Sequence, residues 1–394
     1  MLAVMSTTTD RRAHVGIVGA GQLARMSLQA AIPLGLRVRV LAERADDGAA
    51  LVAADVVLGS PNDPAALLAF ARDCDVVTFD HELVPPRCLE ALVAAGVCLR
   101  PSAETMRLAQ DKRAQRQVFA ALGLPIPSFR VVSGASDVDD VVASLGRPLV
   151  LKAARGGYDG RGVWVADGYG AVRARIRDLT EAGIEVVAER WVPIERELAI
   201  MVVRRPGGQT VVYPLVETVQ VDGICREVIS PAPVPPGLAI EAEAIARTIA
   251  EASGVVGILA VELFVSGGRL IVNEIATRPH NSGHYSIEGC VTSQFEQHLR
   301  AVLDWPLGAT TPTAPVVVTV NVLGGPDARD PFAALPDALS IEGVHVHLYG
   351  KAPRPGRKLG HVTVCANDVE SARERARAAA ALLSGAPVPQ EANT

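Results

Sequence analysis

The chain has 394 residues, 49% of them hydrophobic and 21% charged, which is typical of a globular protein large enough for two or three domains. Its net charge of −5 comes from interspersed acids and bases, so we expect no nucleic-acid partner. No apolar run is long enough for a signal-peptide core or a membrane span, so we expect no membrane partner. The six cysteines form no C-x-x-C pair, which argues against a zinc site or disulfide framework and favours the reducing cytoplasm.

The first predicted unit, residues 1–105, alternates strands and helices after a loose tail over residues 1–12. Strands are predicted over residues 14–18, 37–41, 55–58 and 75–79, and a helix over residues 22–34. Such alternation predicts a parallel sheet with helices on its faces.

The glycine turn after the first strand has two interpretations. Gly19 to Ala24 is a G-x-G-x-x-A variant, and Glu43 follows the second strand, as in a dinucleotide-binding turn. A lone match is weak, because many such turns need glycine for their geometry alone. Gln22 and Arg25 at the helix start equally suit another phosphate or ring. Nicotinamide binding is the lesser alternative, because the rest of the chain supplies a different nucleotide site.

The second and third predicted units are residues 106–310 and 311–394. One helix is expected from Pro101-Ser102 to about Leu122. The other expected elements of the second unit are strands over 148–153, 163–166, 185–189, 197–203 and 210–213, helices over 169–182 and 238–253, and a hairpin bearing Glu262 and Glu274. After a linker over 310–315, strands are expected near 316–322, 345–348 and 361–365, with a final helix over 369–383.

A lysine followed by a glycine-rich loop is the first candidate for nucleotide binding. Lys152 ends an apolar strand, where its ammonium is costly unless it meets an anion. Residues 156–162 hold four glycines in seven positions, so the backbone amides can approach a phosphate. The lysine precedes the glycines, so this is not a Walker A loop, and a plain flexible hairpin is the alternative. Lys112 is either a second phosphate contact or a solvated helix residue.

Two acids in apolar strands predict a divalent-metal site. Glu262 lies inside an apolar strand, and Glu274 follows another, where a carboxylate needs a partner. Mg²⁺ is usually held by one or two carboxylates together with phosphates, and Asn273 can assist. A two-residue turn at Gly267-Gly268 would put Glu274 on the wrong face, so we predict an odd-length loop or a bulge in this hairpin. The alternative is two solvated acids at the hairpin edge.

Two further segments offer polar groups to a ligand. Glu189-Arg190-Trp191-Val192 leaves a strand, where its backbone can meet an adenine edge. Glu197 can accept hydrogen bonds from ribose hydroxyls. The alternative without a ligand is a surface ion pair with Arg196. Arg278, His280 and Asn281 follow Glu274 closely and suit an oxyanion.

The lysine and glycine loop, the E-x-x-V segment and the two glutamates together resemble the ATP-grasp superfamily. Residues 19–26, 156–162, 273–284 and 354–361, in this order, are similar to motifs of the N5-carboxyaminoimidazole ribonucleotide synthase family over about residues 14–365. The resemblance implies a fold of mixed α/β and α+β class with three domains. These are an N-terminal Rossmann-like pre-ATP-grasp domain, a central ATP-grasp domain and a small β-rich C-terminal domain, usually in a homodimer.

The resemblance also implies an activity in de novo purine biosynthesis. Bicarbonate and ATP would give carboxyphosphate and ADP, and the exocyclic amine of 5-aminoimidazole ribonucleotide would then be carboxylated, with release of phosphate. The implied cofactors are ATP and Mg²⁺, with Mn²⁺ as an alternative ion. The competing enzyme is another purine ATP-grasp ligase, such as the formate-dependent glycinamide ribonucleotide transformylase. The competing non-enzyme is a nucleotide-sensing Rossmann-type protein.

The implied site residues fall into four groups. The catalytic group is Asp159, Arg278, His280 and Asn281. The ATP group is Lys112, Lys152, Gly157, Tyr158, Asp159, Gly160, Arg161, Gly162, Val163, Glu189, Arg190, Trp191, Val192, Glu197, Gln220, Asn273 and Glu274. The ribotide group is Gln22, Tyr158, Asp159, Arg161, Lys351, Arg357 and Lys358, and the metal ligands are Glu262 and Glu274. The basic residues among Lys351 to Lys358 are alternatively a solvated turn. Gln220 departs from the family, in which a histidine is common at this position.

Overall fold

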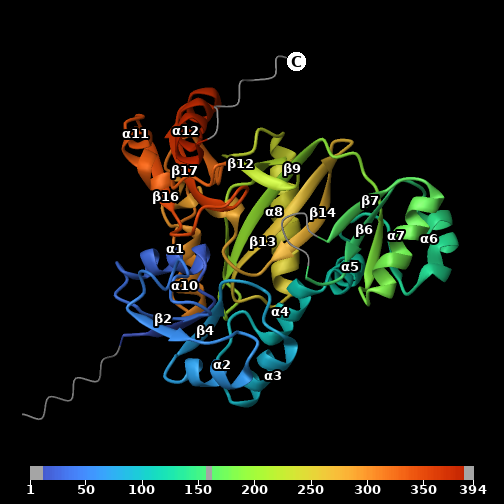
Figure 1. The fold of residues 1–394 in the computed structure, drawn as a ribbon, viewed down its shortest axis with the longest axis horizontal. Helices are drawn as coiled ribbons and strands as arrows, with labels where there is room; N and C mark the ends of the chain where they lie inside the picture. Colours follow the sequence, from blue (N-terminus) through green and yellow to red (C-terminus); the bar gives the residue numbers. More distant parts are fainter. Residues whose placement is uncertain (1–11, 157–161, 386–394) are drawn as a thin grey trace, which may run out of the picture.

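The computed structural model describes residues 12–156 and 162–385. The N-terminal part, drawn in blue in Figure 1, folds around a four-stranded parallel sheet. The strand order is β3-β2-β1-β4. Its strands are β1 (His14–Val18), β2 (Arg37–Ala42), β3 (Asp55–Leu58) and β4 (Val76–Phe79), and its helices are α1 (Gln22–Ala31), α2 (Pro64–Ala71) and α3 (Pro86–Ala94). The predicted parallel sheet is confirmed, although α1 ends at Ala31 rather than Leu34.

Two helices stand where one was predicted. They are α4 (Ala103–Gln110) and α5 (Lys112–Ala121), separated by Asp111 in an extended conformation. The Asp111 carboxylate accepts from the backbone N–H groups of Arg113 and Ala114, so it caps α5. The single-helix prediction was therefore wrong, and the break puts Lys112 in the first turn of α5.

The glycine-rich loop belongs to a small antiparallel sheet in the order β5-β8-β6-β7. The strands are β5 (Phe129–Val132), β6 (Leu149–Ala153), β7 (Val163–Ala166) and β8 (Val186–Arg190). The 3-10 turn η1 (Ala135–Asp137) and the helices α6 (Val138–Leu145) and α7 (Tyr169–Glu181) complete this part. Apolar residues of both helices share one buried core with the sheet. The sequence patterns did not predict β5 or α6.

A large sheet joins the rest of the chain, in the order β14-β13-β9-β11-β12-β15-β17-β16 with β10 beside β9. Its first strands are β9 (Arg196–Arg204), β10 (Thr210–Val212), β11 (Val216–Val221), β12 (Ile224–Ser230), β13 (Gly257–Ser266) and β14 (Arg269–Ala276). Helix α8 (Pro236–Ala252) packs on one face through Ile245 and Ile249. Strands β9 and β10, which pair antiparallel, were predicted, but β11 and β12 were not.

The C-terminal strands extend this same sheet, because β12 pairs with β15. They are β15 (Val316–Leu323), β16 (Val344–Leu348) and β17 (Lys358–Ala366), followed by α12 (Val369–Ser384), and all four lie close to the predicted bounds. Helix α12 covers them with small buried residues such as Ala372 and Ala376. The short elements η3 (Pro331–Ala334) and α11 (Leu335–Leu339) lie beside it. The predicted division at residues 105 and 310 stays a prediction.

Three short elements connect the large sheet to the N-terminal part. They are η2 (Asn281–Gly283), α9 (Ser286–Gly289) and α10 (Gln294–Val302), and α10 packs on both α1 and β13. Fully buried His298 of α10 bonds to the Thr78 hydroxyl on β4 and accepts from the Ile258 N–H on β13. The two sheets are therefore held together through β13, the strand that carries Glu262. Over the described residues, no helix has the length and apolar character needed to cross a membrane.

Candidate active site

A cleft of about 1320 Å³ is lined by residues from the N-terminal part, the small sheet and the large sheet. The predicted site residues that line it are Gln22, Lys112, Lys152, Val163, Glu189, Arg190, Trp191, Val192, Glu197, Gln220, Glu262, Asn273, Glu274, Arg278, His280, Asn281, Lys351, Arg357 and Lys358. Gly162 is described but is not among the lining residues. Gly157, Tyr158, Asp159, Gly160 and Arg161 lie outside the described residues.

The predicted irregularity of the acidic hairpin is confirmed as a β-bulge. The turn at residues 267–268 has two residues, and Leu263 pairs with Val272, yet Glu262 pairs with Glu274. Asn273 is therefore the extra residue, beside the acids rather than at the glycine pair. Val272 and Ile275 consequently both face the core under α8, and Glu274 turns to the other face. Residues directly opposite in an antiparallel pair share a face, so both carboxylates point the same way.

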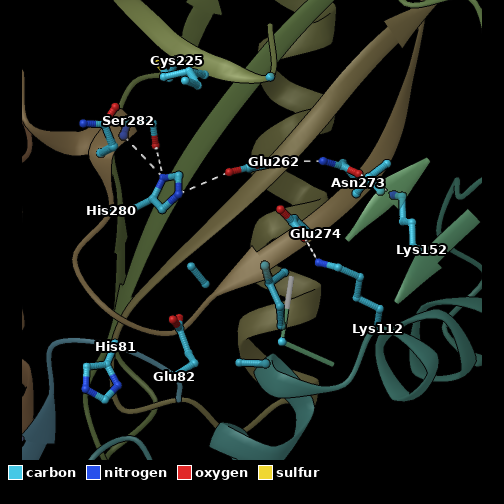
Figure 2. A pocket seen from close by; sticks show the side chains of 18 of the residues that line it. His81, Glu82, Lys112, Lys152, Cys225, Glu262, Asn273, Glu274, His280 and Ser282 are labelled. Atoms are coloured by element: carbon cyan, nitrogen blue, oxygen red, sulfur yellow. Dashed lines mark hydrogen bonds and ion pairs between the residues drawn. The ribbon is translucent and has the colours of Figure 1, made fainter. Parts of the chain in front are cut away.

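The bulge residue connects the acids to their neighbours (Figure 2). Asn273 donates from Nδ2 to Glu262 Oε2 at 3.3 Å, and its Oδ1 accepts from Lys152 Nζ at 3.0 Å. On the opposite side, His280 Nε2 lies 3.2 Å from Glu262 Oε1. A lysine, an amide, a carboxylate and an imidazole thus form one continuous polar row along the cleft.

Lys152 lies in a buried ionic cluster. Its Nζ is 3.0 Å from Glu189 Oε2, and Arg116 Nε donates to Glu189 Oε1 at 2.7 Å. Burial lowers the pKa of Lys152, and Glu189 partly opposes that shift. Burial alone would raise the pKa of Glu189, but the charges of Lys152 and Arg116 hold it below its usual value. The Glu189 side chain is thus paired with two cations. Any hydrogen bond from Glu189 to a nucleotide would therefore come from its backbone.

Lys112 is not a solvated helix residue, because its side chain is only 14% exposed and pairs with Glu274. Burial pushes the pKa of Glu274 upward, but the charge and hydrogen bond of Lys112 bring it below its usual value. The Lys112 N–H donates to the Ala154 carbonyl at 2.8 Å, which ties the start of α5 to the end of β6. Both lysines therefore reach the same end of the cleft.

Glu197 also faces the cleft, and its pKa is raised to about 7 by burial and by the charge of Glu262. Its neighbour Arg196 points to the other face of β9 and pairs with Glu217 at 2.8 Å. The alternative interpretation, a surface ion pair between Arg196 and Glu197, is therefore wrong.

We call residues 277–284 the anion loop, and the N-terminal part of the chain holds its beginning. Glu82, which follows β4, accepts from Arg278 Nε at 2.6 Å and from the Thr277 N–H at 3.1 Å. Asn281 and Asn321 exchange two amide hydrogen bonds, at 2.9 and 2.8 Å. Sequence reasoning missed Glu82 as a site residue. The available signal was its position after a buried parallel strand, where sites in α/β sheets gather.

The opposite end of the cleft is basic. Lys351 Nζ donates to Gln22 Oε1 and lies 5.5 Å from the centre of the Tyr349 ring. Arg354, Arg357 and Lys358 line the same cleft, so the interpretation as an ordinary solvated turn is not supported. Burial, followed by the charges of Arg354 and Arg44, lowers the pKa of Arg357. We call residues 351–358 the basic turn.

The glycine turn before α1 is blocked for a dinucleotide. Asp80 accepts from the Gly21 N–H at 2.5 Å and from the Ala24 N–H at 3.1 Å. A carboxylate thus already occupies the helix N-terminus, where a pyrophosphate would otherwise be favoured. This contact argues against the nicotinamide alternative.

Comparisons with known proteins agree with this geometry. Family models match residues 12–110 as a ribonucleotide synthetase preATP-grasp domain, residues 117–295 as an ATP-grasp domain, and residues 317–375 as a phosphoribosylaminoimidazole carboxylase C-terminal domain. The fold and the cleft are therefore those of an ATP-grasp ligase.

Individual relatives identify the branch of this class. The N5-carboxyaminoimidazole ribonucleotide synthase of Mycobacterium tuberculosis H37Rv is 48% identical, over 98% of this chain and 92% of the relative. The solved synthetase from Thermus thermophilus has a TM-score of 0.86 and 38% identity, over 96% of this chain and all 100% of that one. The Aspergillus clavatus enzyme in complex with ADP and 5-aminoimidazole ribonucleotide has a TM-score of 0.85 and 33% identity, over 95% and 99%. The chain belongs to the N5-carboxyaminoimidazole ribonucleotide synthase family.

Proposed function

We propose that this chain uses ATP and bicarbonate to carboxylate the exocyclic amine of 5-aminoimidazole ribonucleotide. The products are N5-carboxyaminoimidazole ribonucleotide, ADP and phosphate. The observation that carries the proposal is one cleft joining a buried acid and lysine centre at one end to the basic turn at the other. Such a cleft can hold a nucleoside triphosphate and a phosphorylated acceptor within reach of each other, as group transfer requires.

The nucleotide would lie at the buried end. Lys112 and Lys152 would neutralise its phosphates, which is the main demand of phosphoryl transfer. The segment from Glu189 to Val192 would meet the adenine, and Glu197 would accept from the ribose hydroxyls. Gln220 lies in the same cleft and would supply an amide where relatives commonly have histidine.

A magnesium ion fits the bulged hairpin. Glu262 and Glu274 offer carboxylate oxygens on one face of the hairpin. Asn273 would assist by exchanging the bond between its amide oxygen and Lys152 for one to the ion. Among the described residues no group of three or more His, Cys, Asp or Glu side chains is placed to hold a metal by itself, which suits an ion whose other ligands are phosphates. Bound Mg²⁺, or Mn²⁺ in its place, would screen the negative charge of the transferring phosphoryl group.

Bicarbonate would lie in the anion loop, held by the charge of Arg278 and by His280 and Asn281. It would attack the γ-phosphorus of ATP to give carboxyphosphate, and ADP would leave. The ribotide amine would then attack the carboxyl carbon of carboxyphosphate, or of CO₂ released from it in place. Phosphate would leave, and Asp159 would take the amine proton. The role of Asp159 stays a prediction, as do those of Tyr158 and Arg161 on the same loop.

The ribotide 5′-phosphate would bind the basic turn through Lys351, Arg357 and Lys358, with Gln22 as a further contact. A dianion is well matched to this concentration of cations. A homodimer and a cytoplasmic location also stay predictions.

The test measures ADP release with two pairs of substrates. We expect turnover with 5-aminoimidazole ribonucleotide plus bicarbonate, and none with glycinamide ribonucleotide plus formate. Turnover only with the second pair would establish the competing transformylase. Tight NAD binding without metal-dependent ATP hydrolysis would establish the nucleotide sensor.

A further inference from the structure

A buried glutamine holds the anion loop from behind. Gln294, the first residue of α10, is completely buried, and its side-chain amide bonds to both backbone groups of one residue. Its Oε1 accepts from the His280 N–H at 2.9 Å, and its Nε2 donates to the His280 carbonyl at 2.8 Å. Gln294 itself is not among the residues that line the cleft.

The same amide determines the proton position on a second histidine. Because the two backbone bonds fix its orientation, Nε2 is the atom that faces His284 Nδ1, at 3.1 Å. An amide nitrogen can only donate, so His284 Nδ1 accepts and the ring carries its proton on Nε2. Complete burial lowers the pKa of His284 well below its usual value, which agrees with a neutral ring.

The His280 ring has a defined orientation as well. Its Nδ1 lies 2.8 Å from the Ser282 hydroxyl and accepts from the Ser282 N–H at 3.4 Å. The Nε2 proton is then left to point at Glu262 Oε1, 3.2 Å away. The direction of this proton depends on where the His280 backbone lies. Gln294 fixes that backbone on both sides, so its amide controls how an anion-loop imidazole meets a hairpin carboxylate.

We propose that Gln294 is a positioning residue for bicarbonate, which acts by holding the backbone of His280. The inference rests on the function proposed above. Gln294 touches no substrate in this scheme. Its loss would let His280 shift relative to Glu262 and Arg278, and bicarbonate would bind and react less well.

The chain contains a matched control on the same helix. Gln297 is also completely buried, and its amide makes the same pair of bonds with Gly308: Nε2 donates to the carbonyl at 2.7 Å, and Oε1 accepts from the N–H at 2.9 Å. Gly308 does not line the cleft. Gln294→Met and Gln297→Met therefore remove the same number of backbone bonds at the same depth, and they differ in which loop is released.

The experiment compares Michaelis constants in the two variants and the wild type. In Gln294→Met we expect the KM for bicarbonate to rise roughly tenfold or more, as loss of two hydrogen bonds predicts, with the KM for ATP within about twofold. More ADP should form per carboxylated product. Gln297→Met should lose a similar amount of thermal stability. It should keep the wild-type KM for bicarbonate, the wild-type KM for ATP and the wild-type amount of ADP per carboxylated product. Because KM is a property of the folded fraction, partial unfolding cannot imitate this split.

Equal changes in the KM for bicarbonate in the two variants, or an equal rise in the KM values for ATP and bicarbonate, would overturn the proposed role of Gln294. Neither result would affect the proposed function of the chain. If Gln294→Met does not fold, Ser286→Ala decides, since the Ser286 hydroxyl accepts from the Gln294 N–H and donates to the Gly283 carbonyl. A selective rise in the KM for bicarbonate supports the inference, and unchanged constants overturn it. A wild type that does not turn over bicarbonate with the imidazole ribotide would overturn the proposed function, and this inference with it.

Discussion

At the proposed nucleotide end of the cleft Lys112 and Lys152 each meet a carboxylate, whereas at the proposed ribotide end Arg357 lies among other cations. The first arrangement is nearly neutral and buried. The second keeps an excess of positive charge, although Asp46 and Asp47 of the first domain partly offset it. Under the proposed function, the same residue types would therefore prepare two different kinds of phosphate site.

The difference predicts how each ligand binds. A nucleotide with its metal must exchange contacts with a cluster that is already paired, so its binding depends on geometry and on keeping the charges balanced. A ribotide phosphate enters a field that already favours anions, so its binding should weaken as salt screens that field. The next predictions test this contrast.

The largest effect is expected from Glu274→Gln at the buried end. The change removes a predicted metal ligand and the partner of Lys112, so Mg-dependent turnover should fall at least about 10³-fold, as losses of central electrostatic contacts do. Circular dichroism should show an intact fold. The matched control is Glu251→Gln, which removes a charge from the exposed side of α8. Near-normal turnover in Glu274→Gln would remove the metal role of this hairpin.

The paired nature of that end is tested by Glu189→Gln. It leaves Lys152 and Arg116 buried without their shared counter-ion, which typically costs about 3–5 kcal/mol. Chemical denaturation should detect the loss directly. Glu185→Gln, which breaks the half-exposed pair with Arg113, should cost less than about 1 kcal/mol. Equal losses in the free energy of unfolding would mean that the buried ion pairs of the nucleotide end stabilise the protein no more than an exposed pair does.

The ribotide end is tested by Lys351→Ala. Loss of one charged hydrogen bond to phosphate, worth about 1.5–3 kcal/mol, should raise the KM for the ribotide roughly 10- to 100-fold and leave the KM for ATP nearly unchanged. The wild-type KM for the ribotide should rise with salt more than that for ATP. Arg173→Ala, on an exposed face of α7, controls for net charge. An equal effect on both substrates would contradict separate subsites.

Different features of the nucleotide end were predicted from the sequence to different degrees. Lys152, Glu262 and Glu274 were recognisable because a charged residue in an apolar strand needs a partner, and the odd spacing of the hairpin predicted its bulge. The break at Asp111 was not recognisable, because residues 108–114 read locally as helix. It follows from a cap and from the backbone bond between Lys112 and Ala154, which is a tertiary contact.

Two other features were not predicted, for related reasons. Strand β11 lines the cleft with Thr218 and Gln220, and β12 carries the charged pair Arg226-Glu227; these polar residues interrupt the apolar alternation that marks a strand. Glu82 could not be connected with Arg278, because 196 positions separate them and their contact exists only once the domains have packed. Local patterns predicted individual strands and charges, whereas contacts across the cleft required the fold.

The smallest effect concerns Glu197, which would meet the ribose at the nucleotide end. Its pKa of about 7 in the folded protein, against an ordinary value of 4.5, means that the folded state retains a proton which the unfolded state has lost. Stability should therefore fall as pH rises from about 4.5 to about 7 and then level off, by on the order of 1–2 kcal/mol after allowance for solvent screening. Glu197→Gln should lack this component, so its melting temperature should gain on the wild type between pH 5 and pH 8. Parallel curves of melting temperature against pH for the two proteins would show that Glu197 is not held in a buried, negatively charged environment. The excess charge of the cleft would then lie at the basic end alone.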